Sequence, residues 1–418
     1  MSGRTFRPSR RTVLTAAGAA GLMCATEGVA VAGGDGTERA LSIGRSSRVQ
    51  LTLPRPDGRL PVGTMSLQLI DHSRPDPWTS PARRELMVSL WYPAQHTRGF
   101  RRAAWLPPAA TALYRQQVSA GLHTSLDAVD FPVTHAYENA PARAGLRGYP
   151  VVLFSPAYRT PRALGTALVE DLASRGFVVV TVDHTHEASM VEFPGGRLEL
   201  SRQPASPTEQ DISTALDVRR RDVRFVLREL ARLASGGNPD AENRRLPPGL
   251  RSSLDLSRVG VFGHSLGGDT AAEAMAQNPW IAAGANLDGS FSGTVAATGL
   301  DRPFLLMSNA GHGRDNDPSW ALFWSHLRGW RLNLRLRESG HQTFTDQSPL
   351  VQQLEAALPI PPQVVAALTE AVGTIDADRA VAAERAYLGA FFDLHLRHRD
   401  HHLLSQPSRR YPEIEFIP

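Results

Sequence analysis

The sequence predicts a single α/β domain whose sheet is mostly parallel and doubly wound, with an antiparallel edge at its N-terminal end. Continuous apolar runs, rather than alternating ones, indicate strands that are covered on both faces. Stretches with helical periodicity separate these runs, and such β–α alternation with right-handed crossovers builds a parallel sheet. Two strands that precede the alternation, predicted at residues 65–70 and 86–92, supply the antiparallel edge. The buried strands are predicted at residues 150–154, 177–182, 259–262, 281–287 and 303–307.

Five helices are predicted between and after these strands, at residues 161–174, 209–233, 266–277, 317–327 and 377–396. The apolar side chains of the second helix share one face, and we assign the consecutive arginines 219–221 to its solvated side. Asp317 followed by Pro318 is typical of a helix start, because proline suits the first helical position.

Two further segments are predicted with a specific exposure. Residues 104–122 have helical spacing, and we expect this helix to cover the sheet. The alternative is a lid or lipid-facing element near the entrance of a site. Leu332, Leu334 and Leu336 alternate with polar residues, which predicts a last strand that is exposed on one side.

The first 32 residues have the features of an export signal. Arg10 and Arg11, an apolar stretch at 13–25 and small residues up to Ala32 resemble a twin-arginine signal with its cleavage site. The apolar stretch is too short to span a membrane permanently. Cys24 is the only cysteine and is removed with the signal, so we expect a secreted protein without disulfides.

Composition and charge exclude some classes of partner. Hydrophobic residues make up 42% of the chain and charged residues 21%, as in an ordinary globular protein. All 45 basic residues are arginine, and removal of residues 1–32 leaves 41 arginines against 40 acidic residues. Because the mature chain is nearly neutral and has no concentrated basic face, we expect no nucleic-acid partner. We divide it into a leader (33–64), the α/β domain (65–400) and a C-terminal tail (401–418).

Residues 259–268 indicate where the chemistry lies. A short apolar run leads into Gly263-His264-Ser265-Leu266-Gly267, and a predicted helix follows directly. This strand, turn and helix order is the context of the nucleophile elbow in α/β-hydrolases. A side chain at Gly263 or Gly267 would crowd the turn. Ser265 is therefore predicted to stand exposed at the carboxyl end of its strand, as a catalytic nucleophile.

A serine nucleophile needs a base and a carboxylate that orients the base. His341 is the predicted base, because it lies in the loop after the last predicted strand; His326 lies inside a helix, and four later histidines are assigned to the surface. Two places remain open for the carboxylate. Asp288 ends the strand after the nucleophile unit, whereas Asp315 and Asp317 follow the next strand. Both places lie at carboxyl ends of strands, where the site is expected.

These residues carry a resemblance to a known family. The elbow, Asp288 with its strand and residues 341–346 together resemble the plasma-type (group II) platelet-activating-factor acetylhydrolases and their secreted actinobacterial relatives. Residues 153–155 and 171–179 extend the resemblance, which covers roughly residues 65–400. It implies an α/β-hydrolase fold and Asp288 as the acid, because in that family the acid follows the strand directly after the nucleophile unit.

The resemblance also implies the oxyanion hole. One donor is the backbone N–H of Leu266, and the other is that of Tyr158 in the loop after residues 150–154. The chain departs from the family here, because Ala157 stands where a glycine-containing turn is common. Residues 183–187 carry side chains of the metal-ligand type, but the family has the same loop, so we expect no metal and place His184 in the polar wall of the cleft.

The sequence therefore predicts a secreted serine carboxylic-ester hydrolase that works through an acyl-enzyme, with no metal or organic cofactor. The resemblance implies small or lipid esters as substrates, namely phospholipids with short or oxidised acyl chains or other short-chain esters, and transient contact with a lipid surface. Alternatives are a polyester or cutin hydrolase and a general lipase. A non-catalytic binding module on this scaffold would usually lack a triad residue, and none is missing here.

Overall fold

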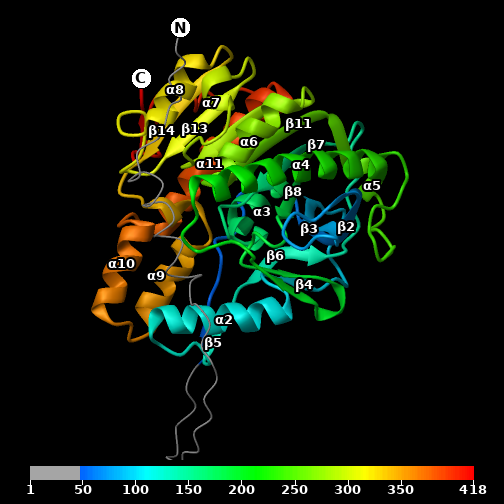
Figure 1. The fold of residues 1–418 in the computed structure, drawn as a ribbon, viewed down its shortest axis with the longest axis horizontal. Coiled ribbons are helices and arrows are strands. Elements are labelled where there is room, and N and C mark those ends of the chain that lie inside the picture. The colour runs from blue at the N-terminus through cyan, green and yellow to red at the C-terminus, as the bar shows by residue number, and fades with distance from the viewer. Residues whose placement is uncertain (1–47) are drawn as a thin grey trace, which may run out of the picture.

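The computed structural model describes residues 48–418, and its main feature is an eleven-stranded mixed sheet (Figure 1). The central strands are parallel, and β3 pairs antiparallel with both β8 and β2. The predicted parallel core and antiparallel N-terminal edge are thus confirmed. The parallel strands, in sheet order, are β14 (Arg331–Leu336), β13 (Phe304–Ser308), β12 (Ile281–Leu287), β11 (Leu254–His264), β7 (Tyr149–Ser155) and β8 (Val178–Asp183).

The sheet is wider than predicted at both ends. Beyond β8 it continues with β3 (Arg83–Pro93), β2 (Val62–Pro75), β6 (Val133–Glu138) and β4 (Arg102–Ala104), and β15 (Ile414–Phe416) joins β14 at the other edge. Two small ribbons lie apart from it, formed by β1 (Val49–Gln50) with β5 (Val129–Asp130) and by β9 (Met190–Glu192) with β10 (Leu198–Leu200).

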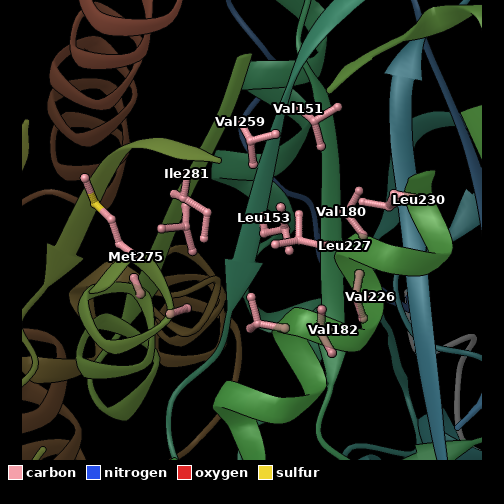
Figure 2. Packing of buried hydrophobic residues seen from close by; sticks show 14 of the residues in the cluster. Val151, Leu153, Val180, Val182, Val226, Leu227, Leu230, Val259, Met275 and Ile281 are labelled. Carbon is pink, nitrogen blue, oxygen red and sulfur yellow. The ribbon is translucent and has the colours of Figure 1, made fainter. Parts of the chain in front are cut away.

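Helices cover both faces of the sheet (Figure 1). One face carries α4 (Glu209–Ala234), α5 (Leu250–Ser253), α6 (Leu266–Gln277), α7 (Val295–Thr298) and α8 (Pro318–His326). The other face carries α3 (Thr166–Ser174), which follows the turn η1 (Arg162–Gly165), and α11 (Ala377–Arg397). Leu227 and Leu230 of α4 lie beside Val180 of β8 in the core (Figure 2). Burial of one such side chain contributes about 1.5–3 kcal/mol.

The helix predicted at 104–122 is present as α2 (Pro108–Leu122), but it does not pack on the sheet as we expected. It lies together with α9 (Gln347–Ala357) and α10 (Pro362–Val372) at one end of the molecule (Figure 1). Tyr114 and Val118 of α2 share a separate apolar cluster with Leu350 of α9 and Leu368 of α10. The prediction was wrong because helical spacing shows that a face is buried but not what covers it.

The predicted domain boundaries also need correction. Leu51 and Leu53 are buried and β2 begins at Val62, so the second half of the predicted leader belongs to the domain. Residues 414–416 of the predicted tail pair with β14, so, contrary to our prediction, β14 is not the last strand of the sheet. The predicted export signal at 1–32 lies outside the described residues. Among residues 48–418, no helix is both long and apolar enough to cross a membrane.

Candidate active site

The chain makes a sharp turn at Ser265, where β11 ends and α6 begins. Ser265 has φ 56° and ψ −126°, a conformation that a residue with a side chain rarely adopts. A Cβ on Gly267 would lie 1.9 Å from the carbonyl oxygen of Ser155, and one on Gly263 would lie 2.2 Å from the backbone of Gly267. Both positions therefore require glycine, and the strained turn is held by the packing around it.

The histidine expected to serve as base lies beside one of the candidate acids. His341 begins the turn η3 (His341–Phe344), and its Nδ1 lies 2.6 Å from Oδ2 of Asp288, the residue after β12. Asp288 is buried and also accepts hydrogen bonds from Asn309 N (2.8 Å) and Asn309 Nδ2 (2.6 Å). Although burial opposes its charged form, the hydrogen bonds from His312 and His341 hold the pKa of Asp288 well below its usual range.

The other two candidate acids have different partners. Asp315 is 64% exposed and forms an ion pair of 2.7 Å with Arg335 on the surface. Asp317 caps α8, where its Oδ1 accepts a hydrogen bond from Ser319 N at 2.8 Å. Neither carboxylate is bonded to His341, so the geometry favours Asp288 among the three.

His264, the residue before Ser265, contacts His341 through a hydrogen bond and through its ring. Its Nε2–H donates to the backbone carbonyl of His341 at 2.8 Å, and the two rings lie 4.6 Å apart. Burial lowers the pKa of His264 to about 3, so this imidazole is neutral and acts as a fixed donor. Ser265 N donates to Leu287 O at 2.9 Å, which ties the turn to the strand that carries Asp288.

The proposed oxyanion donors face no competing acceptor. The backbone N–H groups of Leu266 and Tyr158 have no hydrogen-bond acceptor among residues 48–418, and neither Ser265 Oγ nor His341 Nε2 is bonded within this range. Tyr158 is half-buried and packs against the apolar cluster of Ala215, Leu216 and Leu266. The hydrogen-bonding capacity of all four groups is therefore unused within residues 48–418.

His312 is a second histidine on Asp288 that the sequence analysis did not single out. Its Nδ1 lies 2.8 Å from Asp288 Oδ1, and its Nε2 lies 2.9 Å from Asp317 Oδ2. Burial opposes its charged form, but the hydrogen bonds and charges of the two carboxylates outweigh burial and raise the pKa of His312 to about 10. His312 is thus a cation that holds Asp288 and α8 together. Its place in the loop after β13, at the carboxyl edge of the sheet, was the available signal.

Replacing His312 by glutamine is expected to destabilise the fold in a pH-dependent way. The folded-state pKa of about 10 exceeds the ordinary value of 6.5. The contribution of the cation is therefore complete below about pH 6.5 and is lost as the pH rises through about 10. We expect a loss of about 3 kcal/mol in unfolding free energy at pH 6, because a buried ion pair is broken. Urea unfolding of both proteins at pH 6, 8 and 10 measures the difference, and a difference independent of pH would contradict a charged His312.

The ligand-type residues at 183–187 lie in a buried polar network. We expected His184 in the wall of the cleft, but it is only 1% exposed and does not line an open cleft. Its Nε2 bonds Ser155 Oγ at 3.0 Å, and its Nδ1 bonds Asp222 at 2.9 Å. This second Ser–His–Asp arrangement is closed to solvent, since Ser155 and Asp222 are 2% and 0% exposed. Within residues 48–418 no cluster of His, Cys, Asp and Glu side chains has the arrangement of a metal site.

Arg219 also belongs to this network and corrects the prediction that it is solvated. It is 1% exposed and pairs with Glu187. The signal was present in the sequence, because Arg219 lies three residues after Leu216 and four before Val223, which places it on the buried face of α4.

The order of the parallel strands, with the turn at Ser265 on the central strand β11, defines this protein as an α/β-hydrolase. It is similar to the solved ferulic acid esterase from Streptomyces cinnamoneus, with a TM-score of 0.71 and 36% identity over 88% of this chain and 99% of that one. The chain belongs to the family described as platelet-activating factor acetylhydrolase, isoform II, whose model matches residues 45–354. The resemblance stated from the motifs is thereby confirmed, and the protein is an esterase.

Two curated relatives carry names from the same family. A probable 1-alkyl-2-acetylglycerophosphocholine esterase of Arthroderma benhamiae is 29% identical over 401 residues, which cover 90% of this chain and 97% of the relative. A platelet-activating factor acetylhydrolase of Cavia porcellus is 24% identical over 272 residues, which cover 57% of this chain and 55% of the relative.

Proposed function

We propose that the protein is a serine carboxylic-ester hydrolase in which Ser265, His341 and Asp288 form the catalytic triad. The observation that carries the proposal is the pairing of His341 with Asp288 beside the strained turn of Ser265. Because Nδ1–H of His341 donates to Asp288, the unprotonated Nε2 is left to accept the proton of the serine hydroxyl. The bonds from Asn309 and His312 fix the carboxylate in place.

In the proposed reaction, Ser265 Oγ attacks the ester carbonyl while His341 Nε2 takes its proton. The N–H groups of Leu266 and Tyr158 stabilise the oxyanion of the tetrahedral intermediate. The intermediate then collapses, the alcohol leaves with the proton from His341, and an acyl-enzyme remains. Water, activated by the same histidine, hydrolyses the acyl-enzyme and restores the serine.

For the substrate we propose phospholipids with a short acyl chain or other short-chain esters. The name of the Arthroderma benhamiae relative, which matches nearly its whole length, supports this class. Feruloyl esters are the second candidate, because the solved ferulic acid esterase is more similar to this chain, at 36% identity. Transient contact of the enzyme with a lipid surface is part of the proposal only for phospholipid substrates.

A substrate panel tests the proposal. We expect turnover of p-nitrophenyl acetate that falls with acyl-chain length, and a higher kcat/KM for an acetylated ether phospholipid than for methyl ferulate. A preference for methyl ferulate would move the assignment to the second candidate. A polyester film completes the panel, and failure of the wild-type protein to hydrolyse any of these esters would reject the proposed activity.

We further propose that residues 1–32 direct export of the folded protein through the twin-arginine route. The motif around Arg10 and Arg11 and the small residues before Ala32 support this proposal. Replacement of both arginines by lysine is expected to keep the protein inside an expressing bacterium. Immunoblots of cells and culture medium measure the effect, and unchanged secretion of the double variant would contradict the twin-arginine route.

A further inference from the structure

A buried ion pair lies directly beneath the loop that supplies Tyr158. Nε and Nη2 of Arg219, on α4, bond the two carboxylate oxygens of Glu187 at 2.5 and 2.7 Å. Arg219 and Glu187 are 1% and 0% exposed, so both charges are fully removed from water. Burial opposes the charged form of Glu187, but the guanidinium of Arg219 holds its pKa below the usual value. The pair is therefore ionised, and each member depends on the other.

The ion pair holds the loop by its backbone. Arg219 Nη1 donates to the carbonyl of Pro156 at 2.6 Å, and Nη2 donates to the carbonyl of Ala157 at 3.0 Å. Glu187 Oε1 accepts the N–H of Arg159 at 3.0 Å. Arg159 has φ 57°, so the turn ends in a strained conformation that needs such support. The loop thus rests on a charge-assisted clamp and not on a regular element of secondary structure.

The clamp determines where the N–H of Tyr158 points. In a planar trans peptide the carbonyl and the N–H point in opposite directions. Because the carbonyl of Ala157 points inward to Arg219, the N–H of Tyr158 in the same peptide points away from the interior. The nucleophile turn lies next to this loop: a Cβ on Gly267 would lie 2.7 Å from Pro156 O, and the Tyr158 side chain packs against the apolar cluster that contains Leu266.

We propose that Arg219, held by Glu187, is a positioning residue that aims the N–H of Tyr158 at the developing oxyanion on the substrate. This inference rests on the proposed function, in which Tyr158 N–H is an oxyanion donor. Arg219 lies outside the loop and holds the peptide between Ala157 and Tyr158 in one orientation. A flexible turn would have to adopt that orientation anew for each substrate.

The test uses variants that separate positioning from stability. Arg219→Met combined with Glu187→Gln removes the clamp without leaving a buried charge, and the amide oxygen of the new glutamine side chain can still accept the N–H of Arg159. Arg219→Lys keeps the charge, but its three N–H donors cannot make the four hydrogen bonds that Arg219 gives to Glu187 and to the two carbonyls. Arg385→Met is the matched control, because Arg385 is also buried and donates to the backbone carbonyls of Ala167, Arg55 and Pro54, away from the site.

Activity is measured as kcat per active site, titrated with a fluorophosphonate, so that unfolded protein does not count. We expect the double variant to lose about 10²–10³-fold in kcat, the effect of losing one oxyanion donor, with KM within about threefold of wild type. The kcat of Arg219→Lys is expected to lie between that of the wild type and that of the double variant. The affinity for a trifluoromethyl ketone, which forms a tetrahedral oxyanion on the serine, should fall in parallel, whereas Arg385→Met should leave both quantities within about twofold.

Wild-type kcat in either Arg219 variant would overturn the inference, as would a loss of kcat that leaves the affinity for the ketone unchanged. If only one of the two variants folds, its result decides. If the wild-type protein itself neither hydrolyses esters nor reacts with the fluorophosphonate, the proposed function has failed, and that outcome is separate from a failure of the clamp.

Discussion

Replacement of Ser265 by alanine is expected to lower ester hydrolysis by at least about 10⁴-fold, because it removes the hydroxyl on which the proposed acyl-enzyme forms. The fold should survive, since the alanine removes only a hydroxyl that has no partner among residues 48–418. The φ of 56° at this position is already adopted by a residue with a Cβ. The measurement is kcat with p-nitrophenyl acetate, together with covalent labelling by a fluorophosphonate.

The control for this experiment is the other Ser–His–Asp arrangement. Ser155 lies 3.0 Å from His184, but it is only 2% exposed. We therefore expect Ser155→Ala to be labelled to completion, and Ser265→Ala not to be labelled at all. Labelling that persists in Ser265→Ala and disappears in Ser155→Ala would identify Ser155, and not Ser265, as the nucleophile.

Asp288→Asn is expected to reduce kcat by about 10³–10⁴-fold, with a smaller effect on KM. The amide nitrogen cannot accept the Nδ1–H of His341, so the imidazole loses the tautomer that leaves Nε2 free for the serine proton. His312 would also lose one of the two carboxylates that stabilise its charge. Far-UV circular dichroism and active-site titration check that the variant is folded before the rate is compared.

Asp315→Asn is the matched control, because Asp315 also follows β13 and was a candidate for the same role. Its only ion pair within residues 48–418 is with Arg335, and it is 64% exposed. A surface pair of this kind contributes about 0–1 kcal/mol, so we expect near-wild-type activity. Equal losses in the two variants, or a larger loss in Asp315→Asn, would contradict the assignment of Asp288.

The parallel strands were predictable because burial on both faces gives a continuous apolar run in the sequence. The helices between them were predictable from the helical spacing of their apolar residues. The continuous apolar run at 281–287 and the cap at Asp317 each reflect forces that act within one element. The short strand β15 was missed because its three residues, Ile414–Phe416, gain their stability from pairing with β14, which is distant in sequence. Helix α2 was predicted as a helix but not with its true partners, α9 and α10.

The sequence by itself determined the parallel fold and the turn at Ser265, because G-x-S-x-G between a strand and a helix is a local pattern with a local steric reason. It also placed His341 and Asp288 at carboxyl ends of strands, where the topology of a parallel sheet brings loops together. The tertiary structure decided which carboxylate bonds His341, and it brought His312 onto Asp288 and Arg219 onto the loop of Tyr158. These contacts join residues 24 to 63 positions apart, and their geometry follows from the packing of whole elements, which no local pattern encodes.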